Sequence, residues 1–150
     1  MDPMQTGLRY RVRRVSRQIA EQHENMHELV RELEQAFTEQ LPDKLKDVLL
    51  RFRGAMDAHF ALEDGVFFPA LHGLNPEQRS ELEELSRQHQ NFGVELERLR
   101  QRLEEGSLER FGTAFHELLK GLALHERREE KMVRAIADTY AASDREEAGE

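Results

Sequence analysis

The chain has 150 residues, which suits a single domain with one continuous core. Its formal net charge of −8 disfavours nucleic acid as a partner, and the absence of cysteine excludes disulfides and thiolate metal ligands. No apolar run is long enough to span a bilayer and the N-terminus lacks the apolar core of a signal peptide, so we expect a cytoplasmic protein without a membrane partner.

Four long segments of the chain place apolar residues at the three- and four-residue spacing of an amphipathic helix. They run from Leu8 to Phe37, from Leu45 to Ala70, from Leu82 to Leu103 and from Phe111 to Ile136. No segment shows the alternation of a strand. The sequence therefore predicts an all-α fold, an antiparallel up-down-up-down four-helix bundle over residues 8–140. We expect a flexible N-terminus at 1–7 and an acidic C-terminal tail at 141–150.

Proline, glycine and capping residues mark three joints between these segments. Leu41-Pro42 separates the first two segments. The second joint is Gly73-Leu74-Asn75-Pro76, where Asn75 has the position of an N-cap and Gln78 that of its capping-box partner. Gly106-Ser107 forms the third joint, with the serine as the next N-cap.

Two histidines and a glutamate recur at a fixed offset of 66 residues, so that His23, His59 and Glu63 are repeated as His89, His125 and Glu129. All six stand in the apolar stripe of their segment. In an antiparallel bundle, residues equidistant from a turn lie at one level, and successive histidines are centred on the three joints. The four histidines should therefore share one core layer, with both glutamates one helical turn further along, about 6 Å away.

A buried layer of four imidazoles and two carboxylates needs a compensating cation, because an unpaired buried carboxylate costs several kcal/mol. Two carboxylates that face each other can bridge two metal ions inside a four-helix bundle. Six nitrogen and oxygen ligands around two ions suit iron best and manganese second, and suit tetrahedral zinc less well. The competing interpretation is a helical bundle with a polar core layer and no metal.

The remaining polar residues near the layer give weaker signals. His27 lies one turn from His23, and two interpretations stay open: a fifth imidazole on one ion, or a boundary residue that points to solvent. His72 and His116 fit ordinary surface positions. Gln22 and Gln88 precede ligands and would orient them from outside the ligand set, although exposed glutamine is the commoner case.

With these residues in place, the chain resembles the haemerythrin-like (HHE-type) domains. The clearest local match is the run His59-Phe60-Ala61-Leu62-Glu63-Asp64-Gly65-Val66-Phe67-Phe68-Pro69-Ala70-Leu71, and the resemblance extends roughly from Leu8 to Tyr140. It implies a non-haem di-iron centre with an oxo or hydroxo bridge, four terminal histidines and bridging Glu63 and Glu129. The oxygen-carrying members have a histidine where this chain has Gly93. They also end in His-x-x-x-x-Asp, whereas Glu129 follows its histidine at four residues.

Three functional classes follow from this site. The leading one is a protein that binds or senses a small ligand, namely oxygen, nitric oxide or peroxide, at the iron pair. Apolar walls should exclude bulk water and larger substrates, and we expect them to consist of Met26, Phe52, Met56, Phe92 and Leu122. The second is an enzyme that consumes peroxide or nitric oxide, or an iron donor for the repair of iron centres. The third is a metal-free helical interaction protein. The sequence leaves the oligomeric state open.

Overall fold

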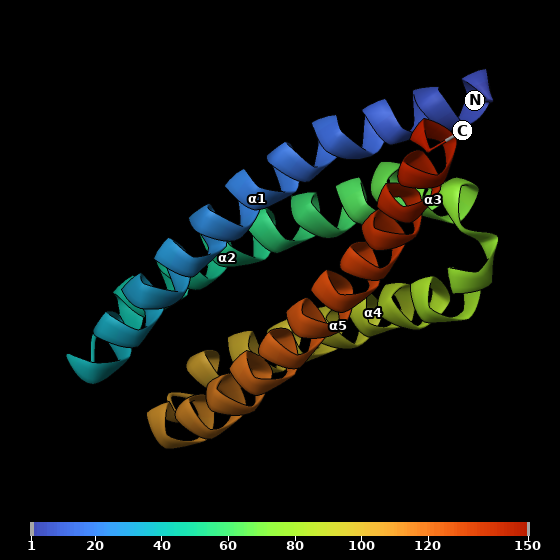
Figure 1. Ribbon diagram of the computed structural model, residues 1–150. Coiled ribbons are helices and arrows are strands. Elements are labelled where there is room, and N and C mark those ends of the chain that lie inside the picture. Colours follow the sequence, from blue (N-terminus) through green and yellow to red (C-terminus); the bar gives the residue numbers. More distant parts are fainter. Residues whose placement is uncertain (1, 150) are drawn as a thin grey trace.

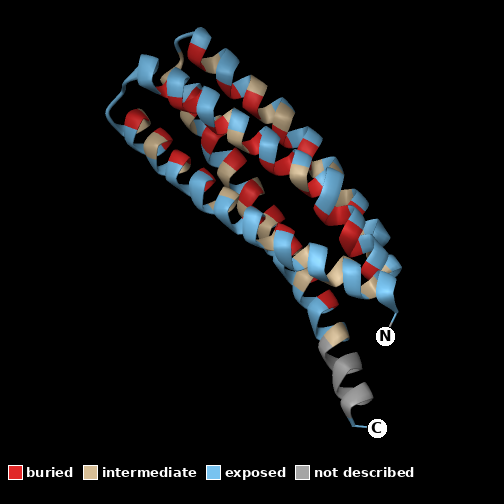
Figure 2. Cartoon of the chain, turned by 90° about the horizontal axis from the view of Figure 1, so that it is seen from above, coloured by how far each residue is buried: buried red, intermediate tan, exposed pale blue. Residues whose placement is uncertain are grey.

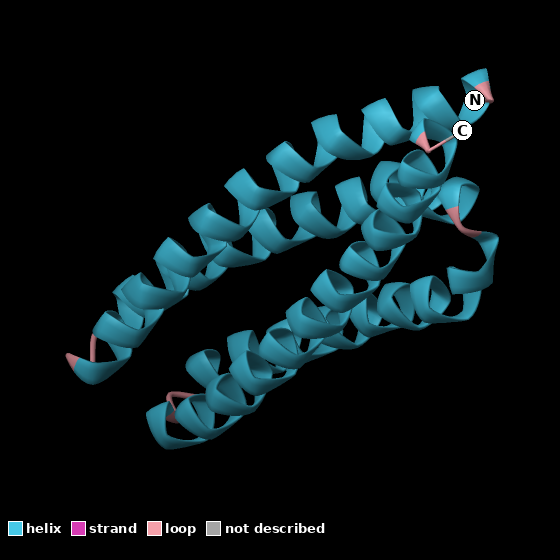
Figure 3. Cartoon of the chain, in the orientation of Figure 1, coloured by secondary structure: helices cyan, strands magenta, loops and turns pink. Residues whose placement is uncertain are grey.

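The structure is a computed structural model that describes residues 2–149, with the side chains of 141–148 excluded. Within these residues the helical elements are, in order, α1 (Pro3–Thr38), α2 (Pro42–Leu62), the π-helix η1 (Glu63–Phe67), α3 (Phe68–Leu74), the 3-10 turn η2 (Pro76–Gln78), α4 (Arg79–Glu104) and α5 (Leu108–Ala148). The described residues contain no strand (Figure 3). The all-α prediction is therefore confirmed.

Four long helical segments form the body of the molecule, because α2, η1 and α3 follow one another without a break. Figure 1 shows α1 beside α2 along most of their length, with α4 and α5 forming a second hairpin. The four segments match the four predicted from apolar spacing. The π-helical turn inside the second segment was not predicted. Among the described residues, no helix is long and apolar enough to cross a membrane.

The first helix begins at Pro3, earlier than its apolar stripe, because residues ahead of the stripe provide a complete start signal. Asp2 has extended backbone angles and its side chain accepts a hydrogen bond from the Met4 backbone N–H at 3.0 Å. Proline at the first helical position needs no hydrogen-bond partner for its nitrogen. The flexibility expected of residues 1–7 stays a prediction. The side chains of the expected tail at 141–148 lie outside the described residues.

Two of the three joints reverse the chain with one residue in the left-handed region. Gln40 (φ 55°) ends α1, where the Leu41 N–H donates to the Ala36 carbonyl at 3.0 Å. Gly106 (φ 76°) does the same after α4, and glycine adopts this conformation without steric cost. Ser107 then caps α5, since its hydroxyl accepts from the Arg110 N–H at 3.3 Å. The predicted N-cap at Ser107 is confirmed.

The joint between α3 and α4 is built differently from its prediction. Asn75 does cap a helical turn, with its side-chain oxygen accepting from the Glu77 N–H at 3.2 Å, but the turn is the short 3-10 segment η2. The predicted capping box with Gln78 is wrong. The Asn75 N–H instead donates to the Leu71 carbonyl at 2.9 Å, which closes the end of α3 and leaves no free donor for the glutamine.

The apolar core consists of two clusters that lie on either side of one polar layer. The larger cluster runs toward the Gln40 and Gly106 joints and includes Phe52, Leu99 and Phe111. The smaller one lies toward α3 and includes Phe68 and Ile136. Figure 2 shows buried residues recurring at intervals along the helices, between exposed ones. The five apolar residues expected to wall the layer are all buried in the larger cluster, namely Met26, Phe52, Met56, Phe92 and Leu122.

Gly112 marks a close approach of α5 to α1, which gives a first testable prediction. A Cβ at this position would lie 2.5 Å from Cζ of Phe37, whereas a Cβ at Gly54 would meet nothing within 4 Å. We expect Gly112→Ala to lower the free energy of unfolding by about 1–3 kcal/mol through overpacking. The matched variant Gly54→Ala should raise it by about 0.5–1 kcal/mol, because alanine favours the helix. Urea unfolding of both variants checks this, and equal effects would contradict the close approach.

Candidate metal centre

One layer of the bundle collects polar side chains from all four long helical segments. His23 comes from α1, His59 from α2, His89 from α4 and His125 from α5. Glu63 opens η1, and Glu129 lies on α5. Five of these six residues are buried, and His23 is half-buried. The structure therefore brings together the six residues that recur in the sequence.

The four imidazoles meet as two pairs, one from each helical hairpin. Nε2 of His23 lies 3.1 Å from Nε2 of His59, and Nε2 of His89 lies 3.2 Å from Nε2 of His125. In both pairs the two histidines are 36 residues apart in the chain. All four rings thus turn the same nitrogen toward the middle of the bundle. An Nε2 without a proton is the usual metal-binding atom of a neutral imidazole.

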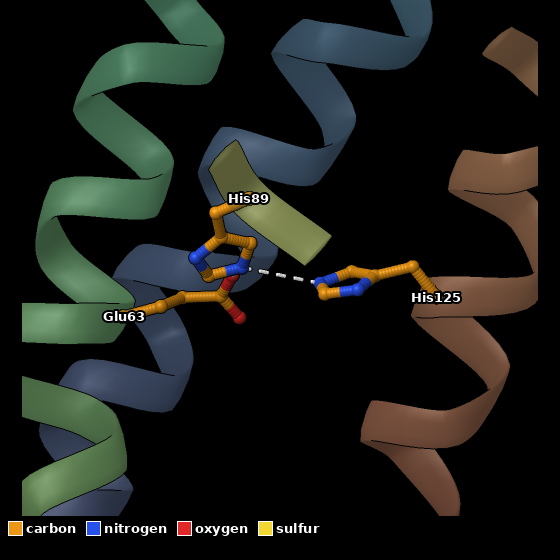
Figure 4. A group of neighbouring side chains, drawn as sticks. All are labelled: Glu63, His89 and His125. Carbon is orange, nitrogen blue, oxygen red and sulfur yellow. Dashed lines mark hydrogen bonds and ion pairs between the residues drawn. The ribbon is translucent and has the colours of Figure 1, made fainter. Parts of the chain in front are cut away.

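Glu63 connects the two imidazole pairs. Its Oε1 lies 3.2 Å from Nε2 of His59 and also 3.2 Å from Nε2 of His89. Figure 4 shows the Glu63 carboxylate next to His89, with His125 facing both from α5. Glu129 approaches from the opposite helix, with its Oε2 3.7 Å from Nε2 of His125. Glu63 therefore belongs to both halves of the layer.

Two groups of three residues bring their possible ligand atoms within 4.8 Å of one another. The first is Glu63, His89 and His125, and the second is His59, Glu63 and Glu129. All of these residues are buried. The described residues thus provide two neighbouring sets of nitrogen and oxygen donors that share Glu63, as a dinuclear site requires.

The buried carboxylates lack the partners that buried polar atoms normally have. Among the described residues, both oxygens of Glu63 and Oε2 of Glu129 have no hydrogen-bond partner. Burial opposes the ionisation of Glu63, but the imidazoles of His59 and His89 hold its pKa well below its usual range. Burial and then the neighbouring Glu63 raise the pKa of Glu129 to about 11. In the absence of a metal, one carboxylate of the pair is therefore ionised and the other keeps a proton.

The same environment keeps two of the imidazoles neutral. Burial, followed by the neighbouring His89, lowers the pKa of His125 to about 4. Burial and then His59 lower the pKa of His23. Burial also opposes protonation of His89, but Glu63 and Asp64 outweigh it and raise the pKa of that ring. His23 and His125 can therefore bind a metal at neutral pH without first releasing a proton.

A glutamine from the neighbouring helix orients one imidazole in each hairpin. Oε1 of Gln22 lies 2.9 Å from Nδ1 of His59, and Oε1 of Gln88 lies 2.6 Å from Nδ1 of His125. An amide oxygen can only accept, so each ring must carry its proton on Nδ1 and leave Nε2 free for a ligand. The exposed position that the sequence favoured for these glutamines is wrong. Their recurrence immediately before His23 and His89 was the signal for this role.

Asp64 orients His89, a role that the sequence reading did not assign. Nδ1 of His89 lies 3.0 Å from Oδ1 of Asp64, and the Ser86 hydroxyl donates to the same oxygen at 2.7 Å. Adjacent residues of an α-helix point about 100° apart. The π-helical turn η1 is wider, with the Phe68 N–H bonded to the Glu63 carbonyl. Glu63 and Asp64, the first two residues of this turn, contact opposite nitrogens of one ring. π-helical turns are frequent at functional sites.

The other histidines lie outside the layer. Nε2 of His27 is 3.5 Å from the Glu126 carboxylate, and 57% of its side chain is exposed. Its ring centroid lies 6.5 Å from that of His23. His72 and His116 are exposed, as the sequence predicted.

The chain matches the family model described as the hemerythrin HHE cation binding domain over residues 14–137. The match contains all six residues of the buried layer. No curated protein and no solved structure matches the chain.

Proposed function

Because the chain belongs to the family of hemerythrin HHE cation binding domains, we propose that its buried layer holds two iron ions and binds or senses a small ligand. The ligand classes that suit such a pair are oxygen, nitric oxide and peroxide. Manganese is the second choice of metal, because the same nitrogen and oxygen donors accept it.

The observation that carries this proposal is the set of buried carboxylate oxygens without hydrogen-bond partners. Both oxygens of Glu63 and one of Glu129 lie among imidazoles in a layer that separates two apolar clusters. A buried polar atom left in this state normally costs about 1–3 kcal/mol, and more when it is charged. A metal cation would satisfy all three oxygens and the four Nε2 atoms together.

The donor set divides naturally between two ions. His23 and His59 would hold one ion, His89 and His125 the other, and Glu63 with Glu129 would bridge them. When bound, an iron pair supplies open coordination positions and one-electron redox chemistry. His27 stays outside this set in our proposal, because its nearest partner is Glu126.

The residues around the six ligands prepare the site for small molecules. Gln22, Gln88 and Asp64 fix three rings with Nε2 turned inward. Phe60 stacks on His89 with ring centroids 3.9 Å apart, and Phe92 meets His125 edge-on at 5.3 Å. These aromatic rings exclude bulk water from that side and leave no room for a large organic substrate.

The antiparallel up-down-up-down course of the helices is part of the same proposal. It is supported by the short joints at Gln40 and Gly106, each of which returns the chain within a few residues. It is also supported by the histidine pairs, because two residues centred on a turn meet at one level only when the flanking helices run in opposite directions. The cytoplasmic location expected from the sequence stays a prediction.

Elemental analysis of protein purified without added metal tests the proposal directly. We expect two irons per chain and an absorption band that appears when the reduced protein meets air. Exposure to peroxide then separates ligand binding, which gives a stable spectrum, from turnover, which consumes the peroxide. A chain that stays metal-free and fully helical after anaerobic loading with iron would overturn the proposal in favour of a helical interaction protein.

Replacement of His27 provides a test of the ligand set. We expect His27→Ala to keep both metal ions, because the ring is largely exposed and contacts Glu126 on α5. His23→Ala, one turn away on the same helix, should lower the metal content. Metal analysis of the two variants side by side checks this. Equal losses would place His27 among the ligands.

A further inference from the structure

The two halves of the metal layer are related by the sequence repeat, but their surroundings differ. On the His89 side, the ring lies against two aromatic residues, Phe60 at 3.9 Å and Phe68 at 5.7 Å between ring centroids. The residues at the repeat-equivalent positions are Glu126 and Arg134. The His89 ring is thus covered by two aromatic rings, whereas charged residues stand at the equivalent positions around His23.

The hydrogen bonds that orient the imidazoles also differ between the two halves. His89 is held through Nδ1 by Asp64, which is itself fixed by the Ser86 hydroxyl. At the equivalent positions around His23 stand Glu130 and Ala20. Among the described residues, His23 makes its only hydrogen-bond contact through Nε2, to His59. Among these residues, Nδ1 of His23 therefore has no carboxylate partner of the kind that Asp64 gives to His89.

A cavity of about 260 Å³ opens beside the less supported half. It lies between α1 and α5, and its walls include His23 and Glu129 of the proposed ligand set. The exposed residues Ala20 and Arg134 also line it. By contrast, His89 and His125 are only 5% and 3% exposed. A larger cavity, of about 790 Å³, borders Asp64, Phe68 and Ser86 on the His89 side, but neither His89 nor His125 lines it. The cavity between α1 and α5 therefore reaches two of the proposed ligands, whereas the rings of His89 and His125 are buried.

From this asymmetry we propose that the two metal positions fill and empty in a fixed order. The inner position, formed by Glu63, His89 and His125, binds the first ion. The outer position, formed by His23 and His59 together with the bridging Glu63 and Glu129, binds the second ion and exchanges it through the cavity. This inference rests on the proposed metal site. It assigns Asp64 and Ser86 as positioning residues for the inner position.

Two physical effects produce the order. The His89 ring is already held in its ligating orientation by Asp64, so the inner position loses less side-chain freedom when an ion binds. An ion there is also enclosed by aromatic rings, which slows its release. The outer position must fix the His23 ring during binding and remains open to water and chelators.

Titration of the metal-free protein with Mn²⁺, followed by electron paramagnetic resonance, tests the order. With one equivalent, ordered filling gives chains that hold a single isolated ion, and the spin-coupled signal of a pair appears only with the second equivalent. Release to excess EDTA should likewise pass through a species with one ion. Binding and release of both ions together, with the coupled signal present from the start, would overturn the order.

Matched variants test which of the two metal positions binds the first ion and which binds the second. Asp64→Asn should weaken binding of the first ion by about 10–100-fold, as expected when a partner of a ligating histidine is lost. The repeat-equivalent variant Glu130→Gln should leave both constants unchanged. Ala20→Leu should narrow the cavity and slow release of the second ion several-fold without affecting the first. Equal effects of Asp64→Asn and Glu130→Gln would refute the positioning role.

The outcomes separate this inference from the proposed function. Two ions that bind with equal affinity leave the metal site intact and overturn only the order. A wild-type chain that binds no Mn²⁺ and no iron overturns the metal site and the order together.

Discussion

Glu63→Gln should remove both metal ions from the protein, the largest single effect that we expect. Glu63 is the one residue shared by the two groups of donors, and its Oε1 lies 3.2 Å from an imidazole of each hairpin. The amide keeps the volume of the side chain but carries no charge and binds metal poorly. Loss of a residue that only hydrogen-bonds to a metal ligand lowers the affinity for metal by up to roughly 100-fold. We expect the loss of Glu63, which is itself a ligand, to lower it by more. Metal analysis and the absorption spectrum report the loss.

The same variant should leave the metal-free fold nearly unchanged, which distinguishes a lost ligand from a damaged core. Metal normally stabilises the wild type through linkage, by about 2.7 kcal/mol when the free metal is at 100 times Kd. Melting of Glu63→Gln should show no such gain. Glu117→Gln on the exposed face of α5 is a matched control and should keep both ions. Two ions in Glu63→Gln would contradict the bridging role.

Metal binding should release a proton from Glu129 and therefore strengthen as the pH rises. Burial and Glu63 raise the pKa of Glu129 to about 11, so this carboxyl is protonated in the metal-free protein at neutral pH. A carboxyl must lose its proton to act as a ligand. The apparent affinity should consequently rise about tenfold for each pH unit between about pH 7 and about pH 9. Competition with a chelator at several pH values measures this slope.

Two variants identify the group that releases the proton. Glu129→Gln has no proton to lose at this position, so the slope should fall by about one proton, and the affinity itself should fall with the lost ligand. Glu130→Gln changes the neighbouring exposed carboxyl and should keep the full slope. An unchanged slope in Glu129→Gln would refute the assignment.

The stability of the metal-free protein should change with pH in the opposite sense. Because the folded-state pKa of Glu129 lies above its usual 4.5, its contribution to stability is present below that value and is lost as the pH rises toward 11. Glu63 and His125 have lowered pKa values, so their contributions are already complete in this window and stay constant. The melting temperature of the metal-free chain should therefore fall between about pH 7 and about pH 9. A melting temperature that stays constant over this window would show that Glu129 is already ionised without metal.

The six residues of the layer could be predicted because their signals combine spacing with periodicity. Each stands where an apolar residue is expected, and the joints fix the level of each histidine. The support around them could not be predicted in the same way. Asp64 stands in the π-helical turn η1 and contacts His89 on α4. Apolar spacing within one segment indicates neither the wider turn nor this contact between helices. Gln22 and Gln88 each contact a histidine on the neighbouring helix. The apolar spacing of their own helix therefore does not reveal this role.

The open question at His27 and the failed prediction at Gln78 were both decided by contacts outside the local motif. His27 lies near the ligand face of α1, and its side chain contacts Glu126 on α5. No local pattern in α1 could indicate this contact. The capping box at Gln78 failed because the Asn75 N–H was already bonded to Leu71, a contact that depends on how α3 ends. In both cases the deciding partner lies outside the motif.

Each helical hairpin carries one imidazole pair and the glutamine that orients it, so the sequence repeat corresponds to half of a metal centre. Two separate copies of such a hairpin, related by a two-fold axis, could form the whole centre as a homodimer. The two metal positions of that dimer would be identical by symmetry. Joining the halves in one chain removes this constraint, because equivalent positions can then hold different residues. Ser86 is equivalent to Ala20, and Phe60 is equivalent to Glu126. Covalent fusion of the halves is thus what permits one ion to differ from the other.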